Sequence, residues 1–291
     1  MEIPVYHIEQ LAAFSTEKTS IGVKRLEQGF RNKPNITSSH RHSFYQIIWV
    51  TQGSGIHLID FNTYPIEPFT LYFLSPGQVH EWKLTEAVFG YIIAFTNKFF
   101  SSSLQDTSLL SELPYFYITN TQPLLCVGNE QAAIFNNIIQ RIETEYQASL
   151  IDHEAMLSAY LRILLIEAKR IYCPNQTTYT VTSSVLITKQ FLLLIEENFL
   201  TQTFVSEYAK LLGITANHLN ETVKRTTGKT AGELIRDRLL LEAKRLLIYS
   251  ELSISEIAHK LNFEDPAYFG RFFKRYAHCS PSDFRQQATS S

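Results

Sequence analysis

The chain has 291 residues, of which 45% are hydrophobic and 13% aromatic, enough for one large or two ordinary packed domains. Its net charge of −2 excludes a strongly basic nucleic-acid-binding composition, and its three separated cysteines, Cys126, Cys173 and Cys279, form no CxxC pair or disulfide framework. It has no apolar run long enough to cross a membrane and no signal-peptide pattern, so we expect a cytoplasmic protein.

Short β-branched and aromatic runs, broken by turn residues, occupy residues 20 to about 120. Examples are FYQIIWVTQGSGIHLIDF, PFTLYFLSPGQVHEW and FGYIIAF. Strands punctuated by glycine and proline predict an antiparallel barrel or sandwich. We assign this β-domain to residues 1–128.

Three histidines lie in these strands where their side chains could meet. His40 and His42 are two residues apart and therefore share one face of a strand, while His80 follows the PGQV turn. Three imidazoles could bind a transition metal, contact a ligand directly, or serve as structural polar groups at the mouth of a barrel. Nearby aromatic residues could line a small-molecule pocket or simply fill the core: Phe44, Tyr45, Trp49, Phe73 and Trp82.

Residues 129–172 change to a helical period, with apolar residues recurring every three or four positions. We expect two amphipathic helices, antiparallel across the QASLID turn. The apolar face of the second helix consists of Leu157, Leu161, Leu164, Leu165 and Ala168. This face is wider than one neighbour is expected to cover, so we predict a homodimer through residues 150–172. The alternative is that the β-domain alone buries the face.

Residues 173–184, CPNQTTYTVTSS, are polar and lack a helical period, so we interpret them as a linker. The charge balance changes at the same place. Residues 1–184 have 12 basic and 16 acidic side chains, a net charge of −4, whereas residues 185–291 have 14 and 12, a net charge of +2. This difference is compatible with a local basic surface on the C-terminal part.

The sequence after the linker predicts helices only, in a pattern that occurs twice. A short helix, a turn and a second helix are repeated with a spacing of 49 residues, which separates Ala209 from Ala258. Gly213 and Asn262 follow these alanines by four positions, and both residue types tolerate the positive φ of a tight turn. Two helix-turn-helix units are therefore predicted, joined by a long helix from about Ala231 to Ser250.

The last of these helices is predicted to place its aromatic and its basic side chains on different faces. Its sequence begins at DPAYFGRFFKRYA, in which Asp265 can cap the helix and Pro266 can occupy the first turn. At 3.6 residues per turn, one stripe consists of Phe269, Phe272, Phe273 and Tyr276. Beside or opposite that stripe lie Arg271, Lys274 and Arg275. The helix is predicted to be anchored through its rings and to present its cations outward.

The stretch IAHKLNFEDPAYFGRFFKRYAHCSPSDFR, with residues 185–287 around it, resembles the DNA-binding domain of AraC/XylS-type transcription regulators. The chain departs from the family pattern at Ala231, Asn262 and His278, none of which lies on the expected DNA surface. HRHSFYQIIWVTQGSG and YFLSPGQVHEW resemble the two cupin motifs of the sensor domain of these regulators, and residues 129–172 resemble its dimerisation helices. The resemblance implies an α+β multidomain protein, with a cupin-like antiparallel β-barrel, two dimerisation helices and an all-α double helix-turn-helix domain at residues 185–291.

The resemblance implies that the second helix of each unit enters the major groove of DNA. The expected base-facing residues are Asn217, Asn220, Glu221, Pro266, Ala267, Gly270 and Arg271. Arginine suits guanine, asparagine adenine and glutamate cytosine. The expected phosphate contacts are Lys224, Arg225, Lys274 and Arg275. For Glu221 the alternative is a solvated acid, whereas Tyr268 is expected to pack rather than to contact a base.

The resemblance also implies a small-molecule effector in the sensor domain, with expected contacts from His40, His42, Tyr45, Gln46, Trp49, His80 and Trp82. Cupin enzymes place metal ligands at the three histidine positions. Gln46, however, stands where metal-binding cupins usually have glutamate, so we expect no functional metal and no cofactor.

These features together predict an effector-responsive transcription regulator rather than an enzyme. It is expected to bind promoter DNA as a homodimer, to activate transcription with RNA polymerase as a further partner, and to have no membrane partner. One alternative is a metal-dependent cupin enzyme whose C-terminal domain localises it to DNA. A second is a fused DNA-repair methyltransferase, but Cys126 and Cys173 lack the sequence setting that this would need.

Overall fold

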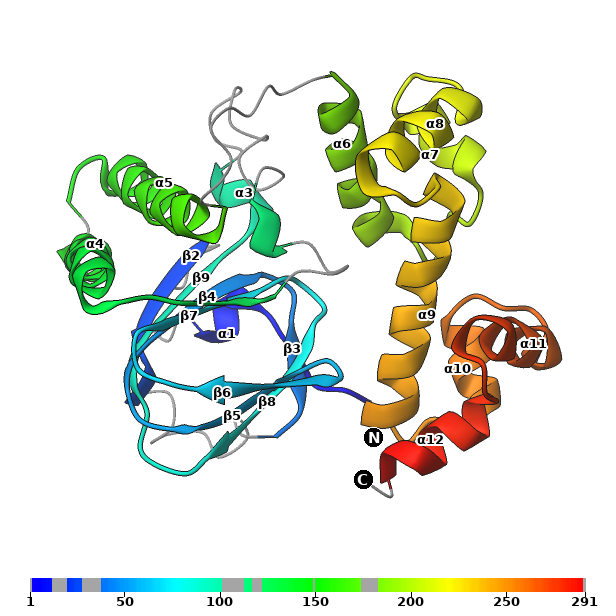
Figure 1. Cartoon of the computed structure of the whole chain (residues 1–291), viewed down its shortest axis with the longest axis horizontal. Helices are drawn as coiled ribbons and strands as arrows, with labels where there is room; N and C mark the ends of the chain where they lie inside the picture. The colour runs from blue at the N-terminus through cyan, green and yellow to red at the C-terminus, as the bar shows by residue number, and fades with distance from the viewer. Residues whose placement is uncertain are drawn as a thin grey trace. The chain divides into compact units, whose positions relative to one another are not determined.

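The computed structural model describes residues 2–11, 20–27, 38–100, 113–116, 122–148, 150–173 and 183–289 (Figure 1). The chain divides into two compact units, Pro4–Thr177 and a second unit formed by Met1–Ile3 with Thr178–Ser291. The expected linker at 173–184 falls almost entirely outside the described residues. Among the helices within the described ranges, none is long and apolar enough to cross a membrane.

The N-terminal unit contains two five-stranded sheets. The first has the order β1 (Val5–Tyr6), β3 (His40–His42), β8 (Val79–Leu84), β5 (Gly55–Ile59) and β6 (Asn62–Ile66). The second has the order β10 (Leu124–Cys126), β7 (Thr70–Leu74), β4 (Tyr45–Gln52), β9 (Phe89–Phe95) and β2 (Ile21–Arg25). All strand pairs are antiparallel except β1 with β3. The predicted barrel is therefore a pair of antiparallel sheets that, over the described strands, does not close.

Strand β4 is buried on both of its faces. Ile48 and Val50 belong to the apolar cluster shared with Trp82 of the first sheet. Ile47 and Trp49 belong to a different cluster, which extends into two helices. Since successive side chains of a strand point to opposite faces, β4 separates the interior between the sheets from the layer beneath the helices.

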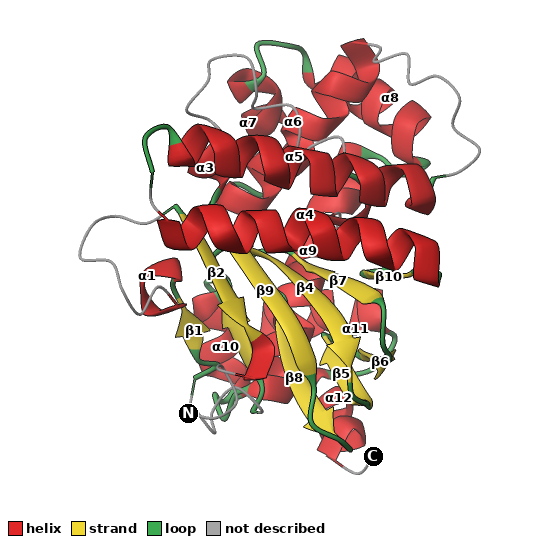
Figure 2. Ribbon diagram, turned by 90° about the vertical axis from the view of Figure 1, so that its left-hand side faces the viewer, coloured by secondary structure: helices red, strands yellow, loops and turns green. Residues whose placement is uncertain are grey.

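Helices α4 (Asn129–Ala148) and α5 (His153–Tyr172) cover the outer face of the second sheet, as Figure 2 shows. Shorter helical segments of this unit are α1 (Ile8–Leu11), α3 (Asn97–Phe100) and η3 (Pro114–Phe116). Leu157, Leu161, Leu164 and Leu165 are at most 1% exposed within this single chain. The prediction that these leucines form a dimer face is therefore wrong, because α4 and the sheet together cover them.

The outward side of the same helix pair carries a different apolar set: Ile134, Met156, Ile163 and Ile166. Their exposed fractions range from 36% to 49%, high for aliphatic side chains on regular helices. On α5, Met156, Ile163 and Ile166 lie at helical spacing and form one stripe. We call these three residues of α5 the outer stripe.

The C-terminal unit is helical throughout its described part. Its helices are α6 (Ser183–Asn198), α7 (Val205–Leu211), α8 (Ala216–Thr227), α9 (Ala231–Tyr249), α10 (Ile254–Lys260), α11 (Pro266–Ala277) and α12 (Pro281–Thr289). Figure 1 shows α7 and α8 at the N-terminal end of α9, and α10 and α11 at its C-terminal end. The predicted pair of helix-turn-helix units joined by one long helix is confirmed.

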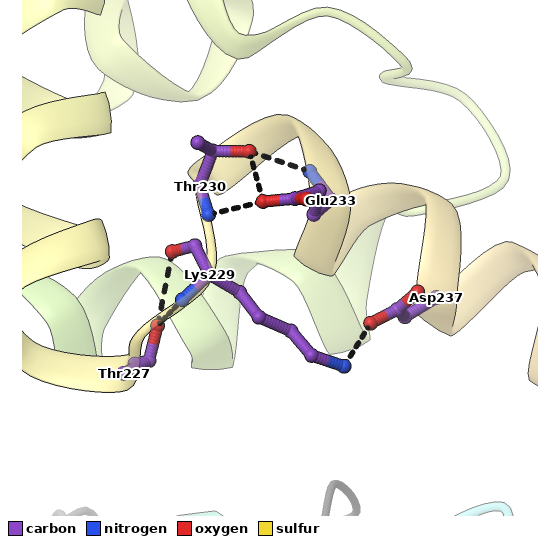
Figure 3. A network of polar contacts seen from close by, with 5 residues as sticks. All are labelled: Thr227, Lys229, Thr230, Glu233 and Asp237. Atoms are coloured by element: carbon purple, nitrogen blue, oxygen red, sulfur yellow. Dashed lines mark hydrogen bonds and ion pairs between the residues drawn. The ribbon is translucent and has the colours of Figure 1, made fainter.

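A polar network fixes the junction between α8 and α9 (Figure 3). Thr230 and Glu233 form a reciprocal cap: the backbone N–H of Glu233 donates to Thr230 Oγ1 (3.3 Å) and that of Thr230 donates to Glu233 Oε2 (2.7 Å). Lys229 Nζ lies 2.7 Å from Asp237 Oδ2, and its backbone N–H donates to Thr227 Oγ1. Since such caps satisfy otherwise unpaired helix N–H groups, the network holds the start of α9 close to the end of α8.

A buried ionic cluster lies where α6 packs against α9. Arg238 Nε is 2.7 Å from Glu196 Oε2, and Arg238 Nη1 is 3.3 Å from Glu242 Oε2. Arg245, which is fully buried, lies 3.5 Å from the same oxygen of Glu242. The guanidinium of Arg238 also lies over the ring of Phe199, 3.8 Å from its centre. These contacts tie α6 to the long helix.

Candidate functional site

The turns of the two helix-turn-helix units have the same hydrogen bonds. Ile214 N donates to Ala209 O (3.0 Å) in the first unit, and Phe263 N donates to Ala258 O (2.9 Å) in the second. Gly213 and Asn262 take positive φ values of 67° and 63°. Asn262 thus replaces glycine in the left-handed conformation, as its residue type predicted.

The second helix of each unit begins at a defined cap. In α8 the backbone N–H of His218 donates to Thr215 Oγ1. In α11 the carboxylate of Asp265 accepts from Ala267 N (2.8 Å) and Tyr268 N (3.2 Å), and Pro266 occupies the first turn. The predicted start of α11 is confirmed.

Aromatic packing sets the orientation of α11. Phe269 and Phe273 are fully buried, and the ring of Phe263 lies 5.3 Å from those of both Phe269 and Phe272. Phe272 and Tyr276 are half-buried at the edge of this stripe. The opposite side of the helix therefore faces away from the core.

The exposed side of α11 carries the predicted cations. Arg271, whose side chain is 68% exposed, lies 3.5 Å from Asp265 Oδ2 and over the ring of Tyr268 at 5.8 Å. Lys274 and Arg275 are exposed one turn further along. Tyr268, which was expected to pack, lies 5.9 Å from the ring of Phe263 but is 58% exposed, so its packing is only partial. These contacts hold the guanidinium near the helix start and leave its outer edge open.

The other positions expected to face DNA differ in exposure. In α11, Ala267 is exposed, whereas Pro266 and Gly270 are half-buried. In α8, Asn217 and Glu221 are exposed and lie within a long hydrogen bond of each other (3.4 Å).

Lys224 and Arg225 of α8 are also exposed, and Arg225 donates to Ser184 Oγ. Asn220 was expected on the exposed face together with Asn217 and Glu221, and it is less exposed than they are. Asn220 is half-buried, and its Oδ1 accepts from Ala231 N at the start of α9 (3.1 Å), so this oxygen has a structural role.

Four histidines meet in the interior between the two sheets. His40 and His80 are directly opposite on β3 and β8. His80 Nε2 lies 2.8 Å from His42 Nε2, and His80 Nδ1 lies 3.0 Å from His57 Nε2 on β5. All four rings are buried, and His57 stacks on Trp82 with a centroid distance of 4.5 Å.

Burial keeps these rings uncharged. It lowers the pKa of His42 and His57 to about 3, lowers that of His80 well below its usual value, and also lowers that of His40. At neutral pH each imidazole therefore has one N–H and one lone pair. The cluster provides hydrogen-bonding and ligating nitrogens, and it provides no positive charge for an acidic effector.

The donor set fits a transition metal ion. His40, His42 and His80 each place a ring nitrogen within 4.8 Å of those of the other two. Neutral imidazole is a preferred ligand of zinc, copper and nickel. Gln46 lies on the same face of β4 as Ile48 and Val50, which pack in the interior cluster with Trp82. The buried Oε1 of Gln46 has no hydrogen-bond partner among the described residues.

Two residues predicted to contact an effector lie elsewhere. Tyr45 packs on Phe116 on the outer face of the second sheet. Trp49 donates from Nε1 to Asn136 Oδ1 of α4 (2.7 Å) and packs against Phe135. These two rings therefore face the helices, whereas the histidines, Gln46 and Trp82 face the interior.

His57 was not among the predicted site residues. In the strand GIHLI, His57 and Ile59 share a face, and Ile59 is opposite His80 on β8. The two-residue alternation was visible in the sequence. The pairing of β5 with β8, which brings His57 to His80, was not.

Two family models match the chain. An AraC-like ligand binding domain matches residues 22–162, and a helix-turn-helix domain matches residues 208–287. The first match contains the histidine cluster, α4 and the first half of α5, and the second contains both turns and both exposed helices.

Similar proteins are transcription regulators. The HTH-type transcriptional regulator YfiF of Bacillus subtilis is 27% identical over 86% of this chain and 79% of its own length. The transcriptional activator RhaS of Salmonella schwarzengrund is 24% identical over 85% of this chain and 87% of its own. The transcriptional activator RhaR of Cronobacter sakazakii is 24% identical over 88% of this chain and 89% of its own length.

Solved structures with similarity to the chain include ToxT from Vibrio cholerae with a bound unsaturated fatty acid, at 15% identity over 96% of this chain and 99% of that one, with a TM-score of 0.39. The C-terminal domain of the response regulator yesN from Fusobacterium nucleatum is 29% identical over 33% of this chain and 93% of that one, with a TM-score of 0.31.

Proposed function

Because this chain belongs to the AraC family of transcription regulators, we propose that its two helix-turn-helix units bind successive major-groove segments of one promoter site. The chain is a DNA-binding regulator that responds to an effector. The observation that carries the proposal is the repeated turn, which presents α8 and α11 from opposite ends of α9.

The length of α9 supports this arrangement. Its 19 residues span about 28 Å at the helical rise. Successive major-groove segments on one face of DNA are separated by about 34 Å. A single stiff helix of this length can hold two recognition helices about one turn of DNA apart.

The two recognition helices have different chemistry. In α11, Arg271 would contact guanine, with Ala267, Gly270 and Pro266 allowing close approach of the helix. In α8, Asn217 and Glu221 would face the bases. The phosphate contacts would come from Lys224, Arg225, Lys274 and Arg275. Asn220 is left out of the contact set because its oxygen accepts from the N-terminus of α9.

The outer stripe of α5 is the proposed dimer interface. Met156, Ile163 and Ile166 are exposed in the single chain, whereas the leucines of the same helix are buried. Residues 150–172 thus remain the proposed dimerisation segment, with the interface on the other face of the helix. Apolar side chains at helical spacing suit self-association of two such helices.

Effector binding would take place between the sheets, at the histidines, Gln46 and Trp82. A shift of β4 would reach the helix pair through Trp49, which bonds to Asn136 of α4. It would thereby change the dimer and the half-site spacing that two protomers reach together. Such coupling is typically about 1–3 kcal/mol and is reciprocal, so operator DNA would tighten effector binding by the same factor.

The relatives RhaS and RhaR are named activators. By similarity, we infer that this chain activates transcription in the cytoplasm and contacts RNA polymerase while bound to its promoter.

Arg271→Ala and Lys274→Ala test the DNA contacts, with Arg170→Ala on α5 as a control for losing one exposed cation. Arg271→Ala should weaken operator binding by about 1–3 kcal/mol and relax the preference at one base pair. Lys274→Ala should weaken all sequences alike and reduce the salt dependence. The assignment of Arg271 to a base is wrong if its loss weakens every sequence equally.

A further inference from the structure

We propose that His40, His42 and His80 form a binding site for one divalent transition-metal ion of the zinc or cobalt type, and that His57 is the residue that positions His80 in it. The inference that this ion is the effector rests on the proposed function. The metal site itself can be measured without DNA.

The surroundings of His40 fix which of its nitrogens is free. His40 Nδ1 lies 2.7 Å from the backbone oxygen of Ser38, and a carbonyl oxygen can only accept. Nδ1 therefore carries the proton of the neutral ring. Its Nε2 is left with a lone pair, on a residue directly opposite His80.

His57 can do the same for His80. His57 Nε2 lies 3.0 Å from His80 Nδ1, and when it accepts a hydrogen bond from Nδ1–H, the Nε2 of the neutral His80 ring has a free lone pair. Metal-bound histidines characteristically donate their second N–H to a carboxylate, a backbone carbonyl or water, which fixes the ring orientation and raises its basicity, and here the lone pair of His57 takes that place. The ring of His57 is held in turn between Trp82 and Tyr72.

The contact between His42 and His80 marks the place for the ion. Their Nε2 atoms are 2.8 Å apart, so one of them must carry a proton that the other accepts. A metal ion can replace this proton if the proton of His42 moves to Nδ1. Ligand nitrogens at about 2.0–2.1 Å from zinc are about 3.3 Å apart in a tetrahedral site. The His42 and His80 nitrogens therefore need to separate by about 0.5 Å, and the His40 nitrogen, within 4.8 Å of both, must come closer by rotation of its ring.

This proposal departs from the expectation that Gln46 leaves the site without a metal. Three histidines bind zinc without a carboxylate ligand in known sites, where the fourth position holds water. The carboxylate is thus dispensable, and the additional histidine, His57, provides the supporting contact. Imidazole nitrogens, rather than oxygens, select transition metals over magnesium or calcium.

The test uses the full chain, purified without a metal-affinity step and freed of metal with a chelator. Titration with Co²⁺ is followed by visible absorption, which reports nitrogen ligation, and Zn²⁺ is used in competition. We expect saturation at one equivalent and a higher melting temperature with metal present. Wild-type protein that takes up no metal at micromolar concentrations overturns the proposal.

Three variants locate the site. His80→Phe should abolish one-equivalent binding, and His57→Phe should weaken it about 10–100-fold. His57→Gln, which keeps an acceptor, should lie closer to the wild type. The control is His259→Ala, an exposed histidine on α10, which should bind as the wild type does. Circular dichroism confirms folding, and the wild-type titration stands even if His80→Phe does not fold.

Two outcomes contradict specific parts of the inference. Equal binding by wild type and His80→Phe places the metal elsewhere and overturns the site. Unchanged affinity in a folded His57→Phe overturns the role of His57. Operator binding is measured separately with and without Zn²⁺: a protein that binds metal but no DNA contradicts the proposed function, whereas one that binds DNA but no metal contradicts only this inference.

Discussion

Replacement of Arg238 by methionine should destabilise the long helix far more than loss of an equally short ion pair on its surface. Arg238 is buried, and its guanidinium contacts Glu196 at 2.7 Å and Glu242 at 3.3 Å. Lys229 contacts Asp237 at the same 2.7 Å, but both side chains are at least one-third exposed. The two pairs therefore separate the effect of burial from that of distance.

The magnitude follows from what each substitution leaves behind. Removal of one partner from a buried pair typically costs about 3–5 kcal/mol, because the other charge stays buried. Arg245 still lies near Glu242, and Glu196 is partly exposed, which reduces the cost to about 2–4 kcal/mol. Lys229→Met should cost about 0.2–1 kcal/mol, as exposed pairs do.

Hydrogen exchange of α9 amides in the full chain measures the free energy of opening for each variant. This readout is local, so the presence of two units in the chain does not complicate it. Arg238→Met combined with Glu242→Gln should cost less than the sum of the two single changes, because the removed charges are coupled. Equal loss of protection in Arg238→Met and Lys229→Met would refute the reasoning.

Three further predictions follow from the two units. In sedimentation, Ile163→Glu should yield folded monomers, whereas Leu161→Glu should unfold the N-terminal unit; a folded dimer of Ile163→Glu would contradict the proposed interface. Asn220→Ala should reduce stability by about 1 kcal/mol, seen as a lower melting temperature, without changing base preference, while Asn217→Ala should change base preference. Capping hydrogen bonds lower the pKa of three exposed carboxylates, Glu233, Glu256 and Asp283. The stabilisation that these carboxylates give is therefore complete above their ordinary pKa values and is lost as the pH falls through the lowered ones. Replacing all three by amides should flatten the acid side of a profile of stability against pH.

The C-terminal fold was predictable because its signals are local. A left-handed turn requires Gly213 or Asn262, and a helix start favours Asp265 followed by proline. These requirements involve residues within one or two turns of each other, so the sequence displays them directly. The repeat of 49 residues then predicted the second unit from the first.

The N-terminal site was only partly predictable because its contacts are long-range. His57 reaches His80 only through the pairing of β5 with β8. The run YQIIWV is buried on both faces, which hides the alternation that separates Gln46 from Tyr45 and Trp49. Helical periodicity likewise identified the leucine face of α5, but could not identify α4 and the sheet as what covers it.

Hydroxyl-radical footprinting of the full chain on its operator tests the central claim most directly. The wild type should protect two patches per protomer, about 34 Å apart on one face of the DNA. Arg271→Ala with Lys274→Ala should remove one patch, and Asn217→Ala with Lys224→Ala should remove the other. A single patch per protomer, or two patches that are lost together in both variants, would contradict the account that each helix-turn-helix unit binds its own segment of the groove.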